Sequence, residues 1–350
     1  MPPPALAAGS PGEPPLTREW RAPCYVDVRV VLSVHRRGPR DPAFRITSDG
    51  ALWRTSRTPD GPGTLRVTAV QAPGPAVRAA GTAQAAGPAQ AAGPAQAAGP
   101  AATGRAATVV SAAAWGPGAA WLLDAVPGLL GAQDDPAGFA PAHPLLRDLS
   151  RRHGGARVGR SGRVLEALVP AVLEQKVVIL EAHRAWRRLL LKFGDPAPGP
   201  APAGLRVFPA AQTWQRIPSW EWHLAGVEAV RARTIAAAAR AAGRVEEILT
   251  MTAADADRRL QALPGIGPWT SAHVRQRACG DADAVAVGDY NLPGAVGWAL
   301  AGRVVDDAGM LDLLAPYAGH RYRVTRLVEL SGVRPPRRGP RNAPRDYRAF

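Results

Sequence analysis

The chain has 350 residues, a formal net charge of +15 and a sequence pI near 11.2. This basic balance predicts an acidic partner, either nucleic acid or an anionic membrane surface. Only two cysteines occur, Cys24 and Cys279, which excludes a disulfide framework and a four-cysteine iron–sulfur cluster. There is no run of 18 apolar residues, no signal-peptide pattern and no zincin or P-loop motif. We therefore expect a cytoplasmic protein, associated with the nucleoid in a prokaryote.

The first third of the chain is predicted to be rich in strands. We expect a disordered tail at residues 1–20, where hydrophobic patterning is weak, and an α+β domain at 21–135. From Tyr25 to Leu32, valines alternate with polar residues, which predicts a half-buried strand. Further strands are expected at 51–55, 64–70 and 108–110, with a Pro/Gly turn at 59–63.

A low-complexity insertion at residues 81–106 interrupts this domain. It contains Ala-Gln-Ala-Ala-Gly-Pro three times in succession. A hexapeptide repeat can indicate a β-helix, but this repeat lacks bulky residues to fill a solenoid core. We therefore interpret it as a flexible insertion without chemical function.

The rest of the chain is predicted to be helical, with one domain at residues 136–333. Pro170 lies inside a predicted helix and indicates a kink or a helix start there. The tail at 334–350 holds six arginines among prolines, which indicates either a mobile arm that attracts DNA or a solvated disordered end. Apolar spacing predicts helices at 119–130, 144–152, 164–193, 227–242, 253–263, 291–301 and 319–331, and another from about residue 268.

The most informative motif is Leu-Pro-Gly-Ile-Gly-Pro-Trp-Thr at residues 263–270. Two glycines permit a tight turn with positive φ and leave no Cβ in the way of a close partner. Pro268 is suited to the first position of a helix, so free amides and the positive helix end should face the turn. Such a turn suits a nucleic-acid phosphate. The alternative is an ordinary tight connection between two helices, which the following Pro-Trp-Thr and Asp289 make less favoured.

Asp289 follows the Trp of this motif by twenty positions and precedes a predicted helix. One interpretation is a helix N-cap, in which the carboxylate accepts the first amides. The other is catalytic: an anion near a clamped nucleotide could stabilise positive charge on the deoxyribose C1′ or activate water. The two interpretations are compatible.

The segment from Leu260 to Pro293 resembles the signature of the helix-hairpin-helix superfamily of base-excision DNA glycosylases. It is most similar to the AlkA-type 3-methyladenine DNA glycosylase II branch. The likeness extends upstream through residues 165–177, similar to that branch's helix with a pocket-side Gln, and so covers residues 145–289. It implies a mainly α fold with a small β-rich N-terminal domain, the helix-hairpin-helix DNA glycosylase fold.

The resemblance also implies roles for individual residues. Asp289 would be the catalytic carboxylate. A main-chain carbonyl near Leu263 would coordinate a monovalent cation, Na⁺ or K⁺, and no other cofactor is implied. The DNA phosphate would be bound through backbone amides of the hairpin at Gly265, Ile266, Gly267 and Thr270.

The same comparison suggests a base pocket. Trp269 would stack on an everted, electron-poor purine, although a core-packing role is the alternative. His273 stands where the branch commonly has Tyr, and is either a ring of similar reach or a helix-surface residue. Gln175 is either a pocket amide or an exposed helical residue. Tyr290 is a further candidate, with His320 and Tyr322 as weaker ones, while Arg275 and Arg277 are either solvated or in contact with phosphate.

We therefore expect a monofunctional DNA glycosylase for alkylated purines such as 3-methyladenine and 7-methylguanine. Lyase relatives use a Lys two residues after the second hairpin Gly, where this chain has Trp269, and lysines occur only at 176 and 192. The expected partner is double-stranded DNA containing damaged bases, with no membrane, no obligatory protein partner and a monomeric state. Alternatives are a same-fold glycosylase for oxidised or mismatched bases, and a non-catalytic helix-hairpin-helix DNA-binding protein.

Overall fold

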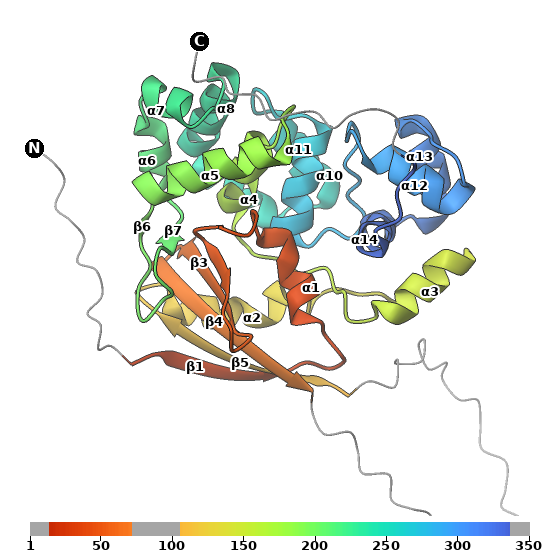
Figure 1. Cartoon of the computed structure of the whole chain (residues 1–350), viewed down its shortest axis with the longest axis horizontal. Coiled ribbons are helices and arrows are strands. Elements are labelled where there is room, and N and C mark those ends of the chain that lie inside the picture. The colour runs from red at the N-terminus through yellow and green to blue at the C-terminus, as the bar shows by residue number, and fades with distance from the viewer. Residues whose placement is uncertain (1–13, 72–105, 337–350) are drawn as a thin grey trace, which may run out of the picture.

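The computed structural model describes residues 14–71 and 106–336. An antiparallel five-stranded sheet lies on one side of the molecule and helices occupy the rest (Figure 1). The predicted insertion at 81–106 and most of the predicted tail at 334–350 lie outside the described residues. The strand order is β1-β5-β4-β3-β2, and the bounds are Leu16–Arg21 for β1, Phe44–Ile46 for β2, Leu52–Thr58 for β3, Gly61–Gln71 for β4 and Thr108–Trp115 for β5.

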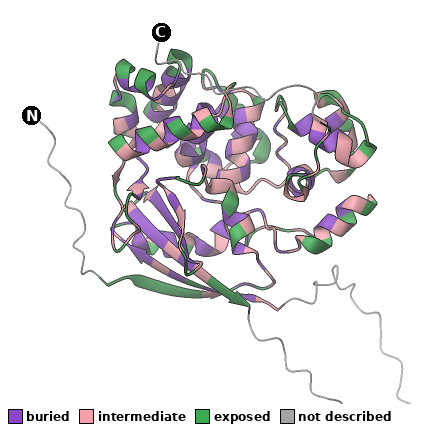
Figure 2. Cartoon of the chain, viewed as in Figure 1, coloured by how far each residue is buried: buried purple, intermediate pink, exposed green. Residues whose placement is uncertain are grey.

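One face of this sheet is covered by α2 (Ala119–Leu129). Alternate residues of the central strands, such as Leu65 and Val110, are buried with Leu122 and Val126 of the helix. Figure 2 shows this burial: β3 is mainly purple, β4 is purple in its middle and exposed toward its end, and β1 is green. The sheet and α2 thus form a core of their own beside the helical part of the molecule.

Two predictions for this region are wrong. The segment after Tyr25 is not a strand but the short helix α1 (Val28–Leu32), followed by a 3₁₀ turn. Asp27 caps it by accepting the Val30 amide, and Val28, Val31 and Leu32 are buried at helical spacing. The disordered tail expected at 1–20 is wrong for residues 16–20, because β1 pairs along its length with β5.

The helical part has two cores. The first surrounds α4 and includes residues of α5, α6, α8, α10 and α11. The second joins α3, α12, α13 and α14. The bounds are α3 Pro144–Arg152, α4 Val164–Leu173, α5 Ile179–Phe193, α6 Ala211–Arg216, α7 Ser219–Leu224, α8 Ala229–Arg240, α9 Ala242–Glu246, α10 Ala253–Gln261, α11 Pro268–Val274, α12 Leu292–Ala301, α13 Asp307–Leu314 and α14 Arg321–Ser331; the short strands β6 Asp195–Pro196 and β7 Arg206–Val207 pair with each other.

Helix α11 contributes to both cores and therefore lies where they meet. Val274 belongs to the first core and Ala272 to the second. Figure 1 shows α11 and α10 between the α4–α8 group and the α12–α14 group. A residue on the exposed side of α11 is thereby positioned by helices of both groups.

The predicted helix at 164–193 is interrupted, although not at Pro170 as expected. Pro170 lies inside α4, which ends at Leu173, and α5 begins only at Ile179. Lys176 in the connection has φ +55°, the one positive φ outside glycine among the described residues. No helix in the described part of the chain is both long and apolar enough to cross a membrane.

A buried carboxylate joins the sheet to the helical part. Glu166 of α4 accepts hydrogen bonds from the Ser56 hydroxyl at 2.7 Å and the Arg57 amide at 2.5 Å, and it pairs with Arg54 at 3.3 Å. Breaking a buried pair by removing one partner costs roughly 3–5 kcal/mol. The contact therefore fixes α4, on which the site depends, against β3.

Candidate active site

The hairpin between α10 and α11 has the predicted form. Gly265 has φ +83°, and a Cβ there would lie 2.2 Å from Oγ1 of Thr234. Gly267 has extended backbone, with φ −105° and ψ −177°, and a Cβ there would meet no atom within 4 Å. Pro268 begins α11. Thus only Gly265 needs positive φ, while Gly267 leaves open space beside the turn.

The amides of this turn are free to bind a ligand. No side chain caps α11, and the amides of Gly267, Trp269 and Thr270 have no acceptor among the described residues. Ile266 points into the first core, and the Thr270 side chain is buried. Any anion at this turn would therefore be bound by main-chain N–H groups.

Gln175, in the connection after α4, is engaged with the hairpin. Its Nε2 donates to the Gly265 carbonyl at 2.9 Å and to Thr270 Oγ1 at 2.8 Å. These two bonds link both sides of the turn to the end of α4. The sequence suggested a pocket amide, but in this structure the amide nitrogen holds the hairpin.

Asp289 faces the hairpin helix. Its Oδ2 accepts a hydrogen bond from Trp269 Nε1 at 2.9 Å. Its Oδ1 accepts from the amides of Asn291 and Leu292 at 2.8 and 2.9 Å, at the start of α12. The carboxylate is half-buried. Asp289 is not the N-cap of α12, which is Asn291, but from two residues earlier it accepts amides at the start of that helix and also lies beside the hairpin helix.

The aromatic candidates divide into two groups. His273 meets the Trp269 ring edge-on, with ring centroids 4.2 Å apart and planes at 71°. Tyr290, next to Asp289, is 91% exposed. Tyr322 is buried, and His320 lies beside Phe139 with its Nε2 3.2 Å from the Ala137 carbonyl. Trp269 is therefore the ring that contacts the carboxylate, His273 contacts Trp269, and Tyr290 is the exposed candidate.

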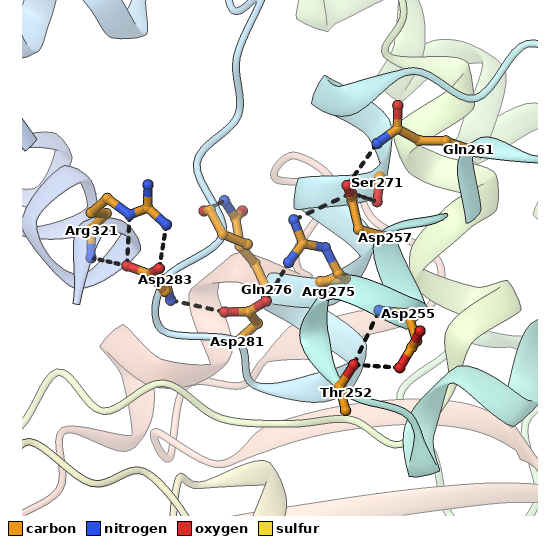
Figure 3. A network of polar contacts seen from close by, with 11 residues as sticks. Thr252, Asp255, Asp257, Gln261, Ser271, Arg275, Gln276, Asp281, Asp283 and Arg321 are labelled. Atoms are coloured by element: carbon orange, nitrogen blue, oxygen red, sulfur yellow. Dashed lines mark hydrogen bonds and ion pairs between the residues drawn. The ribbon is translucent and has the colours of Figure 1, made fainter. Parts of the chain in front are cut away.

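A polar network connects the π-helical segment Arg275–Cys279, which continues α11, to the loop that carries Asp289 (Figure 3). Arg275 donates to Asp281 at 2.5 Å and lies 3.3 Å from Asp257 of α10. Its side chain is only 14% exposed, so neither the solvated nor the phosphate-binding role expected for it fits this geometry. Gln276 donates to the Ala284 carbonyl at 2.8 Å.

The same loop is also bound to α14. Asp283 accepts from the Arg321 amide at 3.0 Å and pairs with its guanidinium. Burial would raise the pKa of Asp283, but the hydrogen bonds and charge of Arg321 outweigh this and lower it. The sequence analysis missed this network. The paired acids in Gly-Asp-Ala-Asp, at 280–283, were the available signal.

The charges of two guanidiniums act on His273, that of the half-buried Arg277 and that of the buried Arg37. Arg277 donates from Nη1 to the His273 carbonyl at 3.1 Å and from Nε to the Val34 carbonyl at 3.2 Å. Arg37 is buried and pairs with Glu174 at 3.3 Å. Burial lowers the pKa of Arg277, and the Arg37 charge lowers it further. The 3₁₀ turn after α1 thereby lies against the π-helical segment Arg275–Cys279, which continues α11.

The main-chain carbonyls predicted to coordinate a cation already accept hydrogen bonds within the protein. The Leu263 carbonyl accepts the Ile266 amide at 3.1 Å and keeps one lone pair, while the Gly265 carbonyl accepts from Gln175. Leu263 would therefore be one ligand of a Na⁺ or K⁺ ion, and the ion remains a prediction.

Comparison with known proteins identifies the fold. A 3-methyladenine DNA glycosylase from Archaeoglobus fulgidus superposes with a TM-score of 0.66 over 89% of this chain and 97% of that one, at 16% identity. An 8-oxoguanine glycosylase/lyase from Clostridium acetobutylicum in complex with duplex DNA gives 0.60 over 89% and 96%, at 11% identity. The chain has the helix-hairpin-helix DNA glycosylase fold. The mainly helical glycosylase fold with a small N-terminal sheet, expected from the sequence, is thus confirmed.

Sequence similarity within this glycosylase fold points to the AlkA type. A probable bifunctional transcriptional activator/DNA repair enzyme AlkA from Mycobacterium tuberculosis is 33% identical over 171 residues. The match covers 47% of this chain and 34% of that protein, so the chain spans about a third of the curated relative's length. No family model matches the chain. The resemblance to AlkA-like members of the superfamily is therefore confirmed.

Proposed function

We propose that the protein is a DNA glycosylase that hydrolyses the N-glycosidic bond of alkylated purines in duplex DNA, acts as a monomer and begins base-excision repair. The proposal rests on the hydrogen bond from the Trp269 indole to Asp289. Trp269 directly follows Pro268, the first residue of α11, and so lies next to the open turn at Gly267. The AlkA-like sequence and the glycosylase fold support the proposal. The basic charge of the chain agrees with DNA as the partner.

Binding would begin at the hairpin. The free amides of Gly267, Trp269 and Thr270 would donate hydrogen bonds to a backbone phosphate, and the target nucleotide would be everted, which costs a few kcal/mol. A cationic purine such as 3-methyladenine or 7-methylguanine would then stack on the Trp269 indole. This arrangement brings C1′ of the everted nucleotide toward the Asp289 carboxylate.

Hydrolysis would require few further catalytic groups. As the C1′–N bond breaks, its electron pair leaves with the base and positive charge develops on the sugar, which Asp289 stabilises. Water adds its oxygen to C1′, and the proton it loses is taken by the carboxylate or by solvent. A cationic base leaves as a neutral molecule, so no strong general acid is required.

We propose that the enzyme has no lyase step. Trp269 stands where lyase relatives carry the amine, and Lys192 is paired with Glu221. Lys176 is the other lysine of the chain and lies beside Gln175 in the connection after α4. Strand scission is therefore a direct test, because Lys176 is the lysine that would have to form the Schiff base.

The experiment is to incubate the full chain with duplex DNA methylated by dimethyl sulfate. We expect free 3-methyladenine and 7-methylguanine, and strand breaks only after alkali. Release of 8-oxoguanine alone, from oxidised DNA, would favour the alternative of an oxidised-base glycosylase, whose fold the clostridial enzyme shares. DNA binding without any base release would favour the non-catalytic DNA-binding alternative.

A further inference from the structure

We propose that Asp307, the first residue of α13, is a positioning residue that holds the backbone directly before Asp289 and thereby orients the proposed catalytic carboxylate. The inference rests on the proposed glycosylase function. It adds a third helix to the site, since the contacts described above join Asp289 to α11 and to α12. In this role Asp307 acts through the main chain of Gly288 and not on the substrate.

The backbone before Asp289 has little to restrain it within its own loop. Residues 286–289 form a turn, in which the Asp289 amide donates to the Ala286 carbonyl at 3.3 Å. Gly288 is the third residue of this turn and has φ +88°, a conformation that favours glycine. A Cβ at Gly288 would meet no atom within 4 Å, so packing does not hold the residue in place. The residue next to the carboxylate therefore needs a restraint from outside the loop.

Asp307 provides that restraint. The Gly288 amide donates to both carboxylate oxygens of Asp307, at 3.1 and 3.2 Å. Hydrogen bonds to an ionised acceptor are stronger than those between neutral groups. Helix α13 also packs beside α12, at whose start the Asp289 carboxylate is bound (Figure 1). Asp289 is thus fixed by its side chain to α11 and α12 and by its preceding residue to α13.

Asp307 is not required to cap its own helix. The N-cap of α13 is Asp306, whose side chain accepts the Gly309 amide at 2.9 Å and whose carbonyl accepts the Met310 amide at 2.9 Å. Among the described residues, Asp307 pairs with no Lys, Arg or His, and its side chain binds the Gly288 amide. Two adjacent acids therefore have separate functions, one within α13 and one across to the loop.

A change at Gly288 is transmitted directly to the reacting position. Without Asp307, the peptide that joins Val287 to Gly288 could rotate, and the Cα of Asp289 would move with it. A misplacement of about 1 Å in a reacting group can cost about 10²-fold in rate. Because the bonds from Trp269 and the α12 amides would still hold the carboxylate, we expect a smaller loss, about tenfold.

The test compares Asp307→Ala, Asp307→Asn and Asp306→Ala in the full chain, well below the melting temperature of each. The rate is single-turnover release of 7-methylguanine from duplex DNA at saturating enzyme, and DNA affinity is measured by fluorescence anisotropy. We expect Asp307→Ala to release the base about tenfold more slowly, with an affinity within about twofold of wild type. Asp307→Asn keeps an oxygen that accepts the Gly288 amide and should stay within about threefold of the wild-type rate.

Asp306→Ala is the matched control, because it removes the cap of the same helix but not the contact with Gly288. It should lower the melting temperature and leave the rate within about twofold of wild type. Equal rate losses for Asp306→Ala and Asp307→Ala would assign the effect to the stability of α13 and overturn the inference. A wild-type rate for Asp307→Ala would overturn it as well, as would an Asn variant as slow as the Ala variant, since the charge and not the hydrogen bond would then matter.

A second measurement does not depend on catalysis. Hydrogen exchange of the Gly288 amide, followed by NMR, should be faster in Asp307→Ala than in wild type or Asp306→Ala, because the amide loses its acceptor. Unchanged exchange would contradict the contact itself. If wild type releases no base but the exchange result holds, the proposed glycosylase function fails while the contact between α13 and the loop stands.

Discussion

The hydrogen bond between Trp269 and Asp289 gives the sharpest quantitative prediction. Replacing Trp269 by Phe removes the indole N–H but keeps an aromatic face. A hydrogen bond to a charged acceptor contributes about 1.5–3 kcal/mol, which corresponds to roughly 10- to 150-fold in rate. Because Oδ1 of Asp289 is still held by two amides at 2.8 and 2.9 Å, we expect the lower end, about a tenfold loss.

The assay is single-turnover release of 7-methylguanine together with DNA affinity. The rate of base release should fall about tenfold, while the affinity for DNA changes less than about twofold. The control is Trp220→Phe, because Trp220 on α7 is 63% exposed. In the double variant with Asp289→Asn, Phe should add no further loss, because the acceptor is already changed. A wild-type rate for the Phe variant, or a further loss in the double variant, would refute a positioning role for this bond.

Three more predictions test the hairpin and its supports. Replacing Gln175 by Leu removes two hydrogen bonds from the turn and should weaken DNA binding about tenfold, measured by fluorescence anisotropy. Gly265→Ala should lower the melting temperature, because the φ of Gly265 is +83° and the added Cβ would meet the Thr234 hydroxyl of α8. Gly267→Ala, where the added Cβ meets no atom, should melt like wild type but bind DNA less tightly. The Arg321 contacts lower the pKa of Asp283 from its ordinary value in the folded state. These contacts therefore stabilise the fold at a pH above the pKa of the unfolded state, and this stability is lost as the pH falls through the folded-state pKa. The melting-temperature deficit of Asp283→Asn should therefore be largest near neutral pH and shrink in acid; a constant deficit would contradict this.

The parts of the fold that were predictable are those encoded locally. The hairpin turn, the start of α11 at Pro268 and the contact of Asp289 with the first amides of α12 each depend on a few adjacent residues whose backbone preferences agree. The helix-hairpin-helix glycosylase assignment came from the resemblance of the segment that contains these features, Leu260 to Pro293, to the signature of that superfamily. Helices with strong apolar spacing, such as α3, also matched the expected bounds.

The two misassigned segments, α1 and β1, have secondary structure that the local sequence pattern does not determine. Valines at α1 satisfy both a two-residue alternation and a helical spacing, and Asp27 decides between them by capping. Strand β1 is largely exposed and has little apolar pattern, because it is stabilised by pairing with β5 about ninety residues later in the sequence. Its existence is thus a tertiary property.

The hydrogen bonds that hold the site in place could not be predicted from the local sequence pattern either. Gln175 reaches the hairpin from 90 residues away, and Glu166 joins α4 to a strand more than 100 residues earlier. The resemblance singled out Gln175, but as a pocket amide and not as a support of the hairpin, and nothing in the sequence marked Glu166. Both supporting roles arise only when distant elements are brought together. The sequence marked His273 as a departure from the AlkA pattern, but its edge-to-face contact with Trp269 required the structure.

The most direct test of the central claim is Asp289→Asn, assayed for free-base release from methylated duplex DNA and for DNA affinity in parallel. Asn keeps the shape and an oxygen that can accept the amides at the start of α12, but it loses the negative charge near C1′. We predict that base release falls by at least about 10²-fold while DNA binding stays within about threefold of wild type. Undiminished base release by this variant would contradict the assignment of Asp289 as the catalytic carboxylate.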